Sequence, residues 1–298
     1  MTSHLYRVLI PLLVFCLVIS SPVFAMTGEP QQIRIIPPQS KADASHHYFQ
    51  QLLERALQLT EVRYGAAEVV FAPHVIEQGR AVENLNEGKW IDVYWMGTSI
   101  EREKDLNAIR IPLVKGLLGY RGFIMTARLQ RSFDVVSDRA SVLKSLSACQ
   151  GMHWPDSDIL EQGGFKVVRS ARYDTLFAML KRNRCDIFPR GVHEGPAEVA
   201  NQVGQGAGIS WEDNALIYYP FPMYFFTSRS NPELAERIRE GLERMIDDGS
   251  FEEFMRHHEV TQHLFPLEQW PGKVSVRLTN PELPADTDYL NPRYWVVP

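Results

Sequence analysis

Three short stretches of the chain place aromatic, hydroxyl and charged side chains directly after apolar segments that predict strands. In parallel α/β sheets ligands bind beyond the carboxyl ends of the strands, so these stretches are candidate binding loops. Indole rings can stack on a solute, and hydroxyl and guanidinium groups can bind a carboxylate. The candidate ligand-binding residues are Trp95, Thr98, Ser99, Trp154, Asp156, Arg190 and Glu194.

Several of these residues also have a purely structural interpretation. Trp95 can belong to the core, and Asp156 or Ser157 can cap the helix that follows. Arg190 can form an internal salt bridge with Glu194 or Asp156, although a basic side chain at the end of a strand is also a suitable anion receptor. The sequence leaves these alternatives open.

Catalytic and metal-binding patterns are weak in this chain. Glu194 and Asp156 are the credible candidates for a cleft acid, which catalysis would need with a raised pKa. We find no nucleophile–base pattern, no phosphate loop and no metal-ligand spacing. The adjacent pair His46-His47 sits near a helix start, where neighbouring side chains point apart. The expectation is therefore a protein that is not an enzyme and that carries neither a metal site nor a cofactor.

One structural unit occurs twice, and it implies two similar lobes. Residues 85–95 and 180–188 each read as a helix end, a residue that tolerates the left-handed conformation, a base, and an aspartate that opens an apolar strand. Gly88 and Asn183 are the stop residues, and Asp92 and Asp186 are expected to position the backbone at the strand starts. The fold class is α/β with a cleft between two lobes.

Other segments complete this organisation. Alternating strands and helices are expected over 33–95 and again over 151–188, with strands at 91–95, 151–154 and 186–188. The extended stretches 109–126 and 218–227 suit the two crossings between the lobes. A helix is expected to begin at Asn231-Pro232-Glu233 and to end at Asp248-Gly249. The proline-rich tail from His263 onward is expected to lie along the surface.

The first 25 residues predict export. Arg7 precedes an apolar run, and Val23-Phe24-Ala25 provides the small residues of a cleavage site. The alternative is a membrane anchor, but the run is short for a span. The mature protein is expected in the periplasm. There Cys149 and Cys185 are expected to form a disulfide, and the alternative is a pair of buried free thiols. The net charge of -5 gives no support for nucleic-acid binding.

The chain resembles the periplasmic solute-binding proteins of the amino-acid-uptake type, which are the bacterial extracellular solute-binding protein family 3 with the two-lobed type II fold. The resemblance rests on 88–93 followed by Thr98-Ser99, on 223–227 with its helix, and on 248–251. It implies a first lobe at 26–119 plus 223–260 and a second lobe at 120–222, with two crossing strands. Residues 1–25 are then the signal peptide and 261–298 a C-terminal extension.

The binding residues implied by this resemblance match only in part. Thr98 and Ser99 fit the hydroxyl role, but the position of the carboxylate-binding arginine falls near Lys104, with Arg102 two residues earlier. The aspartate for the ligand ammonium falls near Gly191, beside Glu194. The resemblance therefore implies an amino-acid-like or other bifunctional solute rather than a plain α-amino acid.

Three functions follow as hypotheses. The first is a monomeric receptor that closes on a small polar solute and passes it to a membrane permease of the ABC type. The second is a sensory or partner-docking protein with the same fold, acting on a membrane sensor. The third is a dehydratase of cyclic acids.

Overall fold

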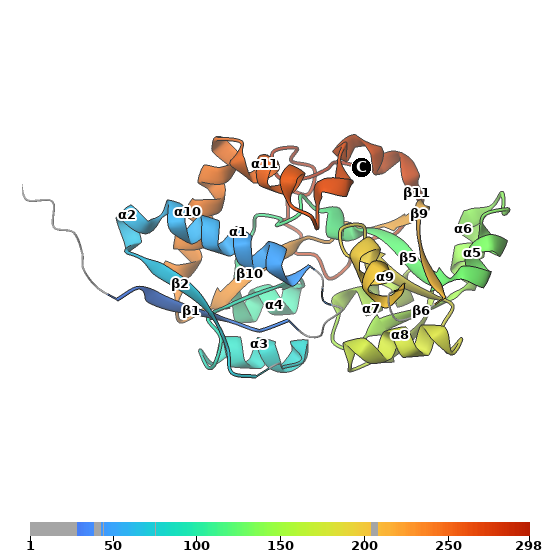
Figure 1. Ribbon diagram of the computed structural model, residues 1–298, viewed down its shortest axis with the longest axis horizontal. Coiled ribbons are helices and arrows are strands. Elements are labelled where there is room, and N and C mark those ends of the chain that lie inside the picture. The colour runs from blue at the N-terminus through green and yellow to red at the C-terminus, as the bar shows by residue number, and fades with distance from the viewer. Residues whose placement is uncertain (1–28, 39–42, 44, 75, 204–207) are drawn as a thin grey trace, which may run out of the picture.

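The protein, described here by a computed structural model, has two α/β lobes joined side by side (Figure 1). The structure describes residues 29–38, 43, 45–74, 76–203 and 208–298. The predicted signal peptide, 1–25, lies outside the described residues. Within the described part of the chain, no helix has both the length and the apolar character needed to cross a membrane.

The first lobe is built on two small sheets. One pairs β1 with β2 in parallel, and the other has the antiparallel order β3-β10-β4. The strands are β1 (Gln31–Ile35), β2 (Ala67–Phe71), β3 (Val93–Gly97), β4 (Leu106–Ile109) and β10 (Met223–Ser228). The helices are α1 (His46–Leu59), α2 (Glu61–Tyr64), α3 (Gln78–Asn86), α4 (Ile100–Asp105), α10 (Pro232–Asp247) and α11 (Ser250–His257).

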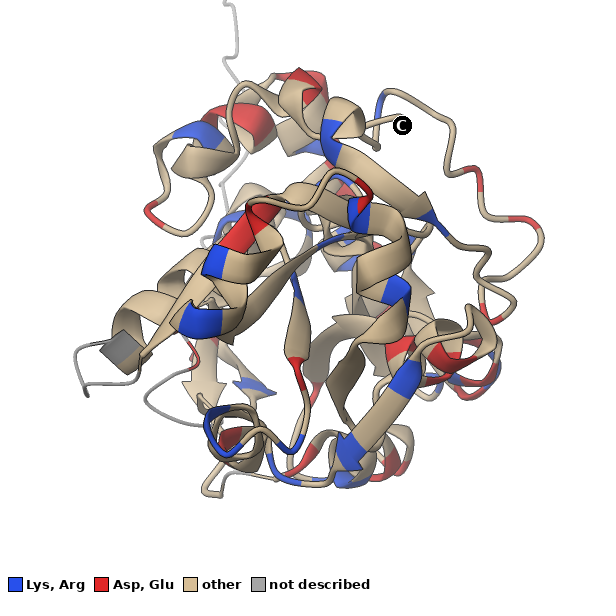
Figure 2. Ribbon diagram, turned by 90° about the vertical axis from the view of Figure 1, so that its right-hand side faces the viewer, with Lys and Arg blue, Asp and Glu red and all other residues tan. Residues whose placement is uncertain are grey.

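The second lobe is built on a six-stranded sheet of order β11-β9-β5-β8-β6-β7. The strands are β5 (Tyr120–Thr126), β6 (Ser147–Gly151), β7 (Lys166–Ser170), β8 (Ile187–Gly191), β9 (Ile209–Tyr218) and β11 (Val274–Arg277). The helices are α5 (Ala127–Phe133), α6 (Arg139–Ser145), α7 (Pro155–Gln162), α8 (Tyr173–Lys181) and α9 (Gly195–Val203). Basic and acidic residues are intermixed along these elements (Figure 2).

The repeated unit has the same role in both lobes. Gly88 and Asn183 both have positive φ, at 66° and 54°, so each ends its helix as predicted. The carboxylate of Asp92 accepts the backbone N–H of Arg34 at 2.8 Å, and that of Asp186 accepts the backbone N–H of Ser147 at 2.8 Å. Each aspartate therefore fixes the start of its strand to a neighbouring strand, which confirms the structural role expected for both.

The strands that carry the candidate loops are displaced from the predicted ones. The strand predicted at 151–154 is β6, which ends at Gly151, so Trp154 instead precedes α7. The strand predicted at 186–188 is β8, which continues to Gly191 and contains Arg190. The prediction ended that strand too early because Pro189 and Arg190 interrupt the apolar run. Both residues are nevertheless buried in the sheet.

The two crossing segments pack directly against each other. The backbone N–H of Tyr219 donates to Gly119 O at 3.2 Å. A Cβ at Gly119 would lie 2.1 Å from Tyr219 O, so only glycine allows this approach. The crossing is therefore fixed at one point by backbone contact.

The C-terminal tail lies largely on the surface, as predicted, but it packs more regularly against both lobes than the sequence indicated. After α11 it enters the second lobe, where β11 pairs in parallel with β9. It then returns to the first lobe, where the carbonyl of Glu282 accepts the backbone N–H of Ile100 at 2.8 Å. Trp270 and Trp295 are buried in it, at 2% and 5% exposure. These large apolar side chains explain why the segment packs against the lobes despite its prolines.

The predicted disulfide is confirmed. Cys149 lies in β6 and Cys185 precedes β8, which pairs with β6 in parallel, and their Cα atoms are 5.6 Å apart. The predicted strand began at residue 151, after Cys149, whereas β6 begins at Ser147 and contains this cysteine. The bond closes a loop between positions 36 residues apart in the sequence.

Removing this disulfide should destabilise the second lobe. In the chain-entropy model a loop of this size contributes about 4 kcal/mol. We expect the double variant Cys149→Ser, Cys185→Ser to unfold at a lower temperature, by roughly 8–16 °C. Calorimetry of the wild type with and without dithiothreitol gives the same comparison without mutation. Equal melting temperatures in all samples would contradict the role assigned to the bond.

Candidate ligand-binding cleft between the lobes

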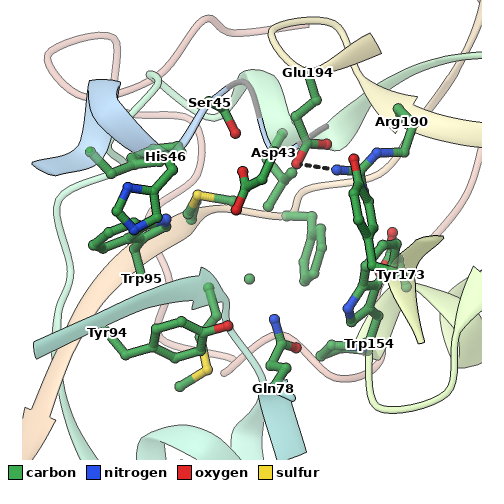
Figure 3. A pocket seen from close by; sticks show the side chains of 18 of the residues that line it. Asp43, Ser45, His46, Gln78, Tyr94, Trp95, Trp154, Tyr173, Arg190 and Glu194 are labelled. Carbon is green, nitrogen blue, oxygen red and sulfur yellow. Dashed lines mark hydrogen bonds and ion pairs between the residues drawn. The ribbon is translucent and has the colours of Figure 1, made fainter. Parts of the chain in front are cut away.

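A cavity of about 100 Å³ lies between the lobes, and both lobes contribute to its wall. Figure 3 shows His46 and Trp95 on one side and Trp154, Tyr173 and Arg190 on the opposite side. Ligand pockets are commonly about 300–1,000 Å³, so the arrangement seen here admits only a small molecule.

Five of the seven candidate residues line this cavity: Trp95, Trp154, Asp156, Arg190 and Glu194. Thr98 and Ser99 are not among the lining residues. The hydroxyl of Thr98 donates to Glu103 at 2.6 Å, and the hydroxyl oxygen of Ser99 caps α4 by accepting the backbone N–H of Arg102 at 3.2 Å. For all seven residues, contact with a ligand stays a prediction.

The second-lobe wall contains a network of five buried charges. Arg121 pairs with Asp156 and, at 3.4 Å, with Glu194. Glu194 also pairs with Arg190 at 2.8 Å, and Arg190 pairs with Glu198 at 2.7 Å. All five side chains are at most 9% exposed. Charges at this depth are tolerated only when they are paired, which explains the density of contacts.

The network contains one carboxyl group more than it contains guanidinium groups. Burial favours the neutral form of Glu194, but Arg190, His193 and Arg121 outweigh it and hold the pKa of Glu194 below its usual value. Burial raises the pKa of Glu198, and Arg190 offsets only part of this effect. Neutrality in the network therefore requires either a proton on Glu198 or a cation from outside the network.

Arg102 is a further buried guanidinium, on the first-lobe side of the cavity. Nη1 donates to Gly97 O, and Nη2 donates to Gln78 Oε1 at 2.6 Å and to His153 O at 2.8 Å. His153 belongs to the second lobe, so this last hydrogen bond connects the lobes. Burial lowers the pKa of Arg102 to about 10. Lys104, the residue nearest the arginine position implied by the resemblance, is exposed.

Arg121 was not predicted, although the sequence contains a signal for it. It is the only charged residue between Lys115 and Arg128, in a stretch of apolar residues and glycines. A charged residue in an apolar extended segment needs a buried partner, which Asp156 supplies here.

His193 lies between the lobes and was also not predicted. It is fully buried, and its ring centroid is 6.2 Å from that of Phe49 in α1. Among the described residues, neither ring nitrogen has a hydrogen-bond partner. Burial lowers the pKa of His193 to about 4; Glu194 opposes this shift, and Arg190, Arg121 and His263 add to it.

Comparison with known proteins identifies the fold. No protein-family model and no curated protein matches the sequence. Among solved structures, the chain is similar to an ancestral arginine-binding protein bound to arginine, with a TM-score of 0.53, 19% identity, and coverage of 76% of this chain and 96% of that one.

Two further solved structures belong to proteins with different roles. One is a putative binding component of an ABC transporter from Wolinella succinogenes complexed with lysine, with a TM-score of 0.55, 14% identity, and coverage of 76% and 94%. The other is a histidine kinase sensor domain with similarity to periplasmic binding proteins, with a TM-score of 0.52, 15% identity, and coverage of 85% and 98%. The two-lobed α/β fold predicted from the sequence is thereby confirmed.

The buried network predicts a strong effect of removing one charge. Arg121→Gln leaves the three buried carboxylates of the network with the single guanidinium of Arg190, and such a loss of a buried partner typically costs about 3–5 kcal/mol. The matched control is Arg239→Gln, which removes an exposed partner of Glu236 and should cost about 0–1 kcal/mol. Urea unfolding followed by circular dichroism measures both. Similar small losses in the two variants would show that the network does not stabilise the fold.

The neutral state of His193 predicts a pH dependence of stability. Its pKa is about 4 in the folded protein and about 6.5 in an unfolded chain, so between these values the unfolded state binds more protons. Stability should therefore rise as the pH increases from 4 to 6.5, with His193 contributing about 3 kcal/mol. His258, whose pKa burial also lowers to about 4, adds to the same slope.

The variant His193→Leu isolates the first contribution. The difference in urea midpoint between pH 5 and pH 7.5 should shrink in this variant and stay unchanged in the exposed control His257→Leu. An unchanged difference in His193→Leu would contradict the prediction.

Proposed function

We propose that this protein is a periplasmic receptor that closes its two lobes on a small polar solute. The observation that carries the proposal is the cavity between the lobes, whose wall includes aromatic and charged side chains from both. A ligand that touches both walls stabilises the closed arrangement over the open one, which is the physical basis of closure. The predicted signal peptide at 1–25 and the lobe boundaries 26–119 plus 223–260 and 120–222 are part of this proposal.

The charges of the two walls favour a bifunctional solute. On the first-lobe side, Arg102 uses three of its five N–H groups on neutral acceptors among the described residues, so a ligand carboxylate can bind the others. On the second-lobe side, the carboxylates Asp156 and Glu194 line the cavity within a network that has one excess acid. A cationic group on the solute is one way to offset this excess, and a proton on Glu198, whose pKa burial raises, is the other. The rings of Trp95 and Trp154 line the cavity and can contact the apolar part of the solute.

The proposed partner is a membrane permease that receives the solute from a monomeric receptor. Solved structures of the same fold include the substrate-binding protein of an amino acid ABC transporter, and this supports an uptake role. Catalysis is not part of the proposal. Glu194, one of the two candidate acids, is held ionised by its basic neighbours, whereas an acid catalyst needs a raised pKa.

A sensory or docking role is the second candidate, and one observation favours it. Most charged groups of the cleft already pair with one another, which leaves fewer of them to bind a solute. The similarity to a histidine kinase sensor domain is compatible with this role. Neighbouring permease and ATPase genes would support uptake, and a neighbouring signalling gene would support sensing.

A ligand panel tests the receptor proposal. We expect a zwitterionic solute at a hundredfold excess over its Kd to add about 2.7 kcal/mol of stability, and to quench or shift tryptophan fluorescence because Trp95 and Trp154 line the cavity. Amino acids, small peptides, carboxylates and polyamines form the panel. Melting temperature and fluorescence are measured on the mature protein.

The variant Arg102→Gln should abolish the response to a carboxylate-bearing hit, and Lys104→Gln should preserve it. The two positions lie on the same short helix, but Arg102 is buried at the cavity and Lys104 is exposed. Circular dichroism checks that both variants fold. A hit that survives Arg102→Gln would refute the assigned carboxylate site, and a panel with no hit would favour the sensory role.

A further inference from the structure

The guanidinium of Arg190 is held in an aromatic enclosure. Its central carbon lies 4.9 Å from the ring centroid of Trp154, 5.3 Å from that of Phe188 and 5.8 Å from that of Tyr173. Faces of aromatic rings attract cations, and the attraction strengthens when water is excluded. Arg190 is 7% exposed, so this enclosure is largely dry.

Two carboxylates complete the enclosure. Nε of Arg190 donates to both carboxylate oxygens of Glu198, at 2.9 and 3.0 Å, and Nη2 donates to Glu198 at 2.7 Å and to Glu194 at 2.8 Å. The resulting forked arrangement matches the planar geometry of a guanidinium and not that of an ammonium ion. Aromatic faces and carboxylates together make a receptor for a cationic planar group.

This receptor forms part of the cleft wall. Trp154, Tyr173, Arg190 and Glu194 all line the cavity, and Figure 3 shows them on one side of it. The side chains come from separate elements: the residue before α7, the start of α8, strand β8 and the β8–α9 region. Four parts of the second lobe therefore converge on a group that the chain itself supplies.

We propose that Arg190 sets the selectivity of the cleft by filling its cation-binding compartment with the protein's own guanidinium. A solute with a basic head group, such as a guanidinium or a long-chain amine, is excluded from this compartment because the space and the carboxylates are already used. The single positive charge of a small zwitterion can still pair with Asp156 and Glu194 where these carboxylates line the cavity. The proposed selectivity rests on the proposed receptor function. The proposal that Arg190 occupies a guanidinium-binding compartment does not depend on that function.

Removal of the side chain should turn the compartment into a binding site. In Arg190→Ala, Glu194 keeps its pairing with Arg121, and Glu198 keeps the hydrogen bond from Tyr173 at 2.6 Å. The loss of the guanidinium leaves excess negative charge beside three aromatic faces. A free guanidinium compound of matching shape restores both the packing and the pairing.

Ethylguanidinium is the probe for this test. At ten times its Kd it should raise the melting temperature of Arg190→Ala by roughly 3–6 °C, with saturation. Wild type should show no saturable shift, and ethylammonium, which carries the same charge without the planar fork, should give a smaller one in the variant. Sodium chloride at equal concentration corrects for ionic strength.

The matched control is Arg237→Ala. Arg237 is also buried, at 2% exposure, but its described acceptors are neutral, among them the carbonyl oxygens of Gly65 and Leu57. Ethylguanidinium should leave this variant unshifted. If ethylguanidinium stabilises Arg237→Ala as much as Arg190→Ala, the proposed compartment is refuted. The same conclusion follows if it stabilises neither variant. Should Arg190→Ala fail to fold in buffer, refolding yield with and without the probe replaces the melting temperature, and no gain in yield counts against the proposal.

Binding of L-arginine and L-lysine to the wild type separates this proposal from the receptor function. Wild type that binds neither of them but binds a neutral zwitterion supports both. Wild type that binds arginine as tightly as the zwitterion refutes the selectivity and leaves the receptor function intact. If ethylguanidinium stabilises Arg190→Ala but no solute of the panel binds the wild type, the receptor function is refuted and the proposed compartment is retained.

Discussion

The ion-pair network of the second-lobe wall is the constraint on which the rest of the cleft depends. Arg121 lies on β5, which enters the lobe from the crossing, and Arg190 lies on the neighbouring strand β8. Because a buried charge without its partner is costly, each of these strands must stay in register with the helices that supply the carboxylates. The positions of Trp154 and Tyr173, which pack around Arg190, follow from the same pairing.

The sequence predicted the fold well because the fold depends on local patterns. Stop residues such as Gly88 and Asn183, and aspartates such as Asp92 and Asp186, act through the backbone of nearby residues, so their types reveal their roles. The disulfide could be predicted because the repeated strand order places both cysteines near the starts of neighbouring parallel strands. The packing of the tail was not predicted, because its prolines hid the strand β11 and the burial of Trp270 and Trp295.

The site was predicted less completely, since its details depend on contacts between distant segments. Whether Arg102 or Lys104 faces the cleft is decided by where α4 begins, and Ser99 fixes that beginning through its cap. This hydrogen bond also uses the hydroxyl oxygen of Ser99, which the sequence had suggested as a ligand-binding group. Arg190 was seen both as an anion receptor and as an internal salt bridge. The structure shows the salt bridges, and the rings that surround Arg190 come from parts of the chain that spacing alone does not connect.

The course of the C-terminal tail has a consequence for the lobe movement proposed above. The tail is hydrogen-bonded to both lobes. The N–H of Leu278 donates to Tyr218 O in the second lobe, and the carbonyl of Glu282 accepts the N–H of Ile100 in the first lobe. Between them, the side chain of Asn280 donates to Pro220 O at the crossing itself. Four residues of fully extended chain span about 14 Å at most. In the proposed closing movement the tail is a tether: while these hydrogen bonds hold, its length limits opening near the hinge. Part of that limit then lies outside the cleft that the solute would occupy.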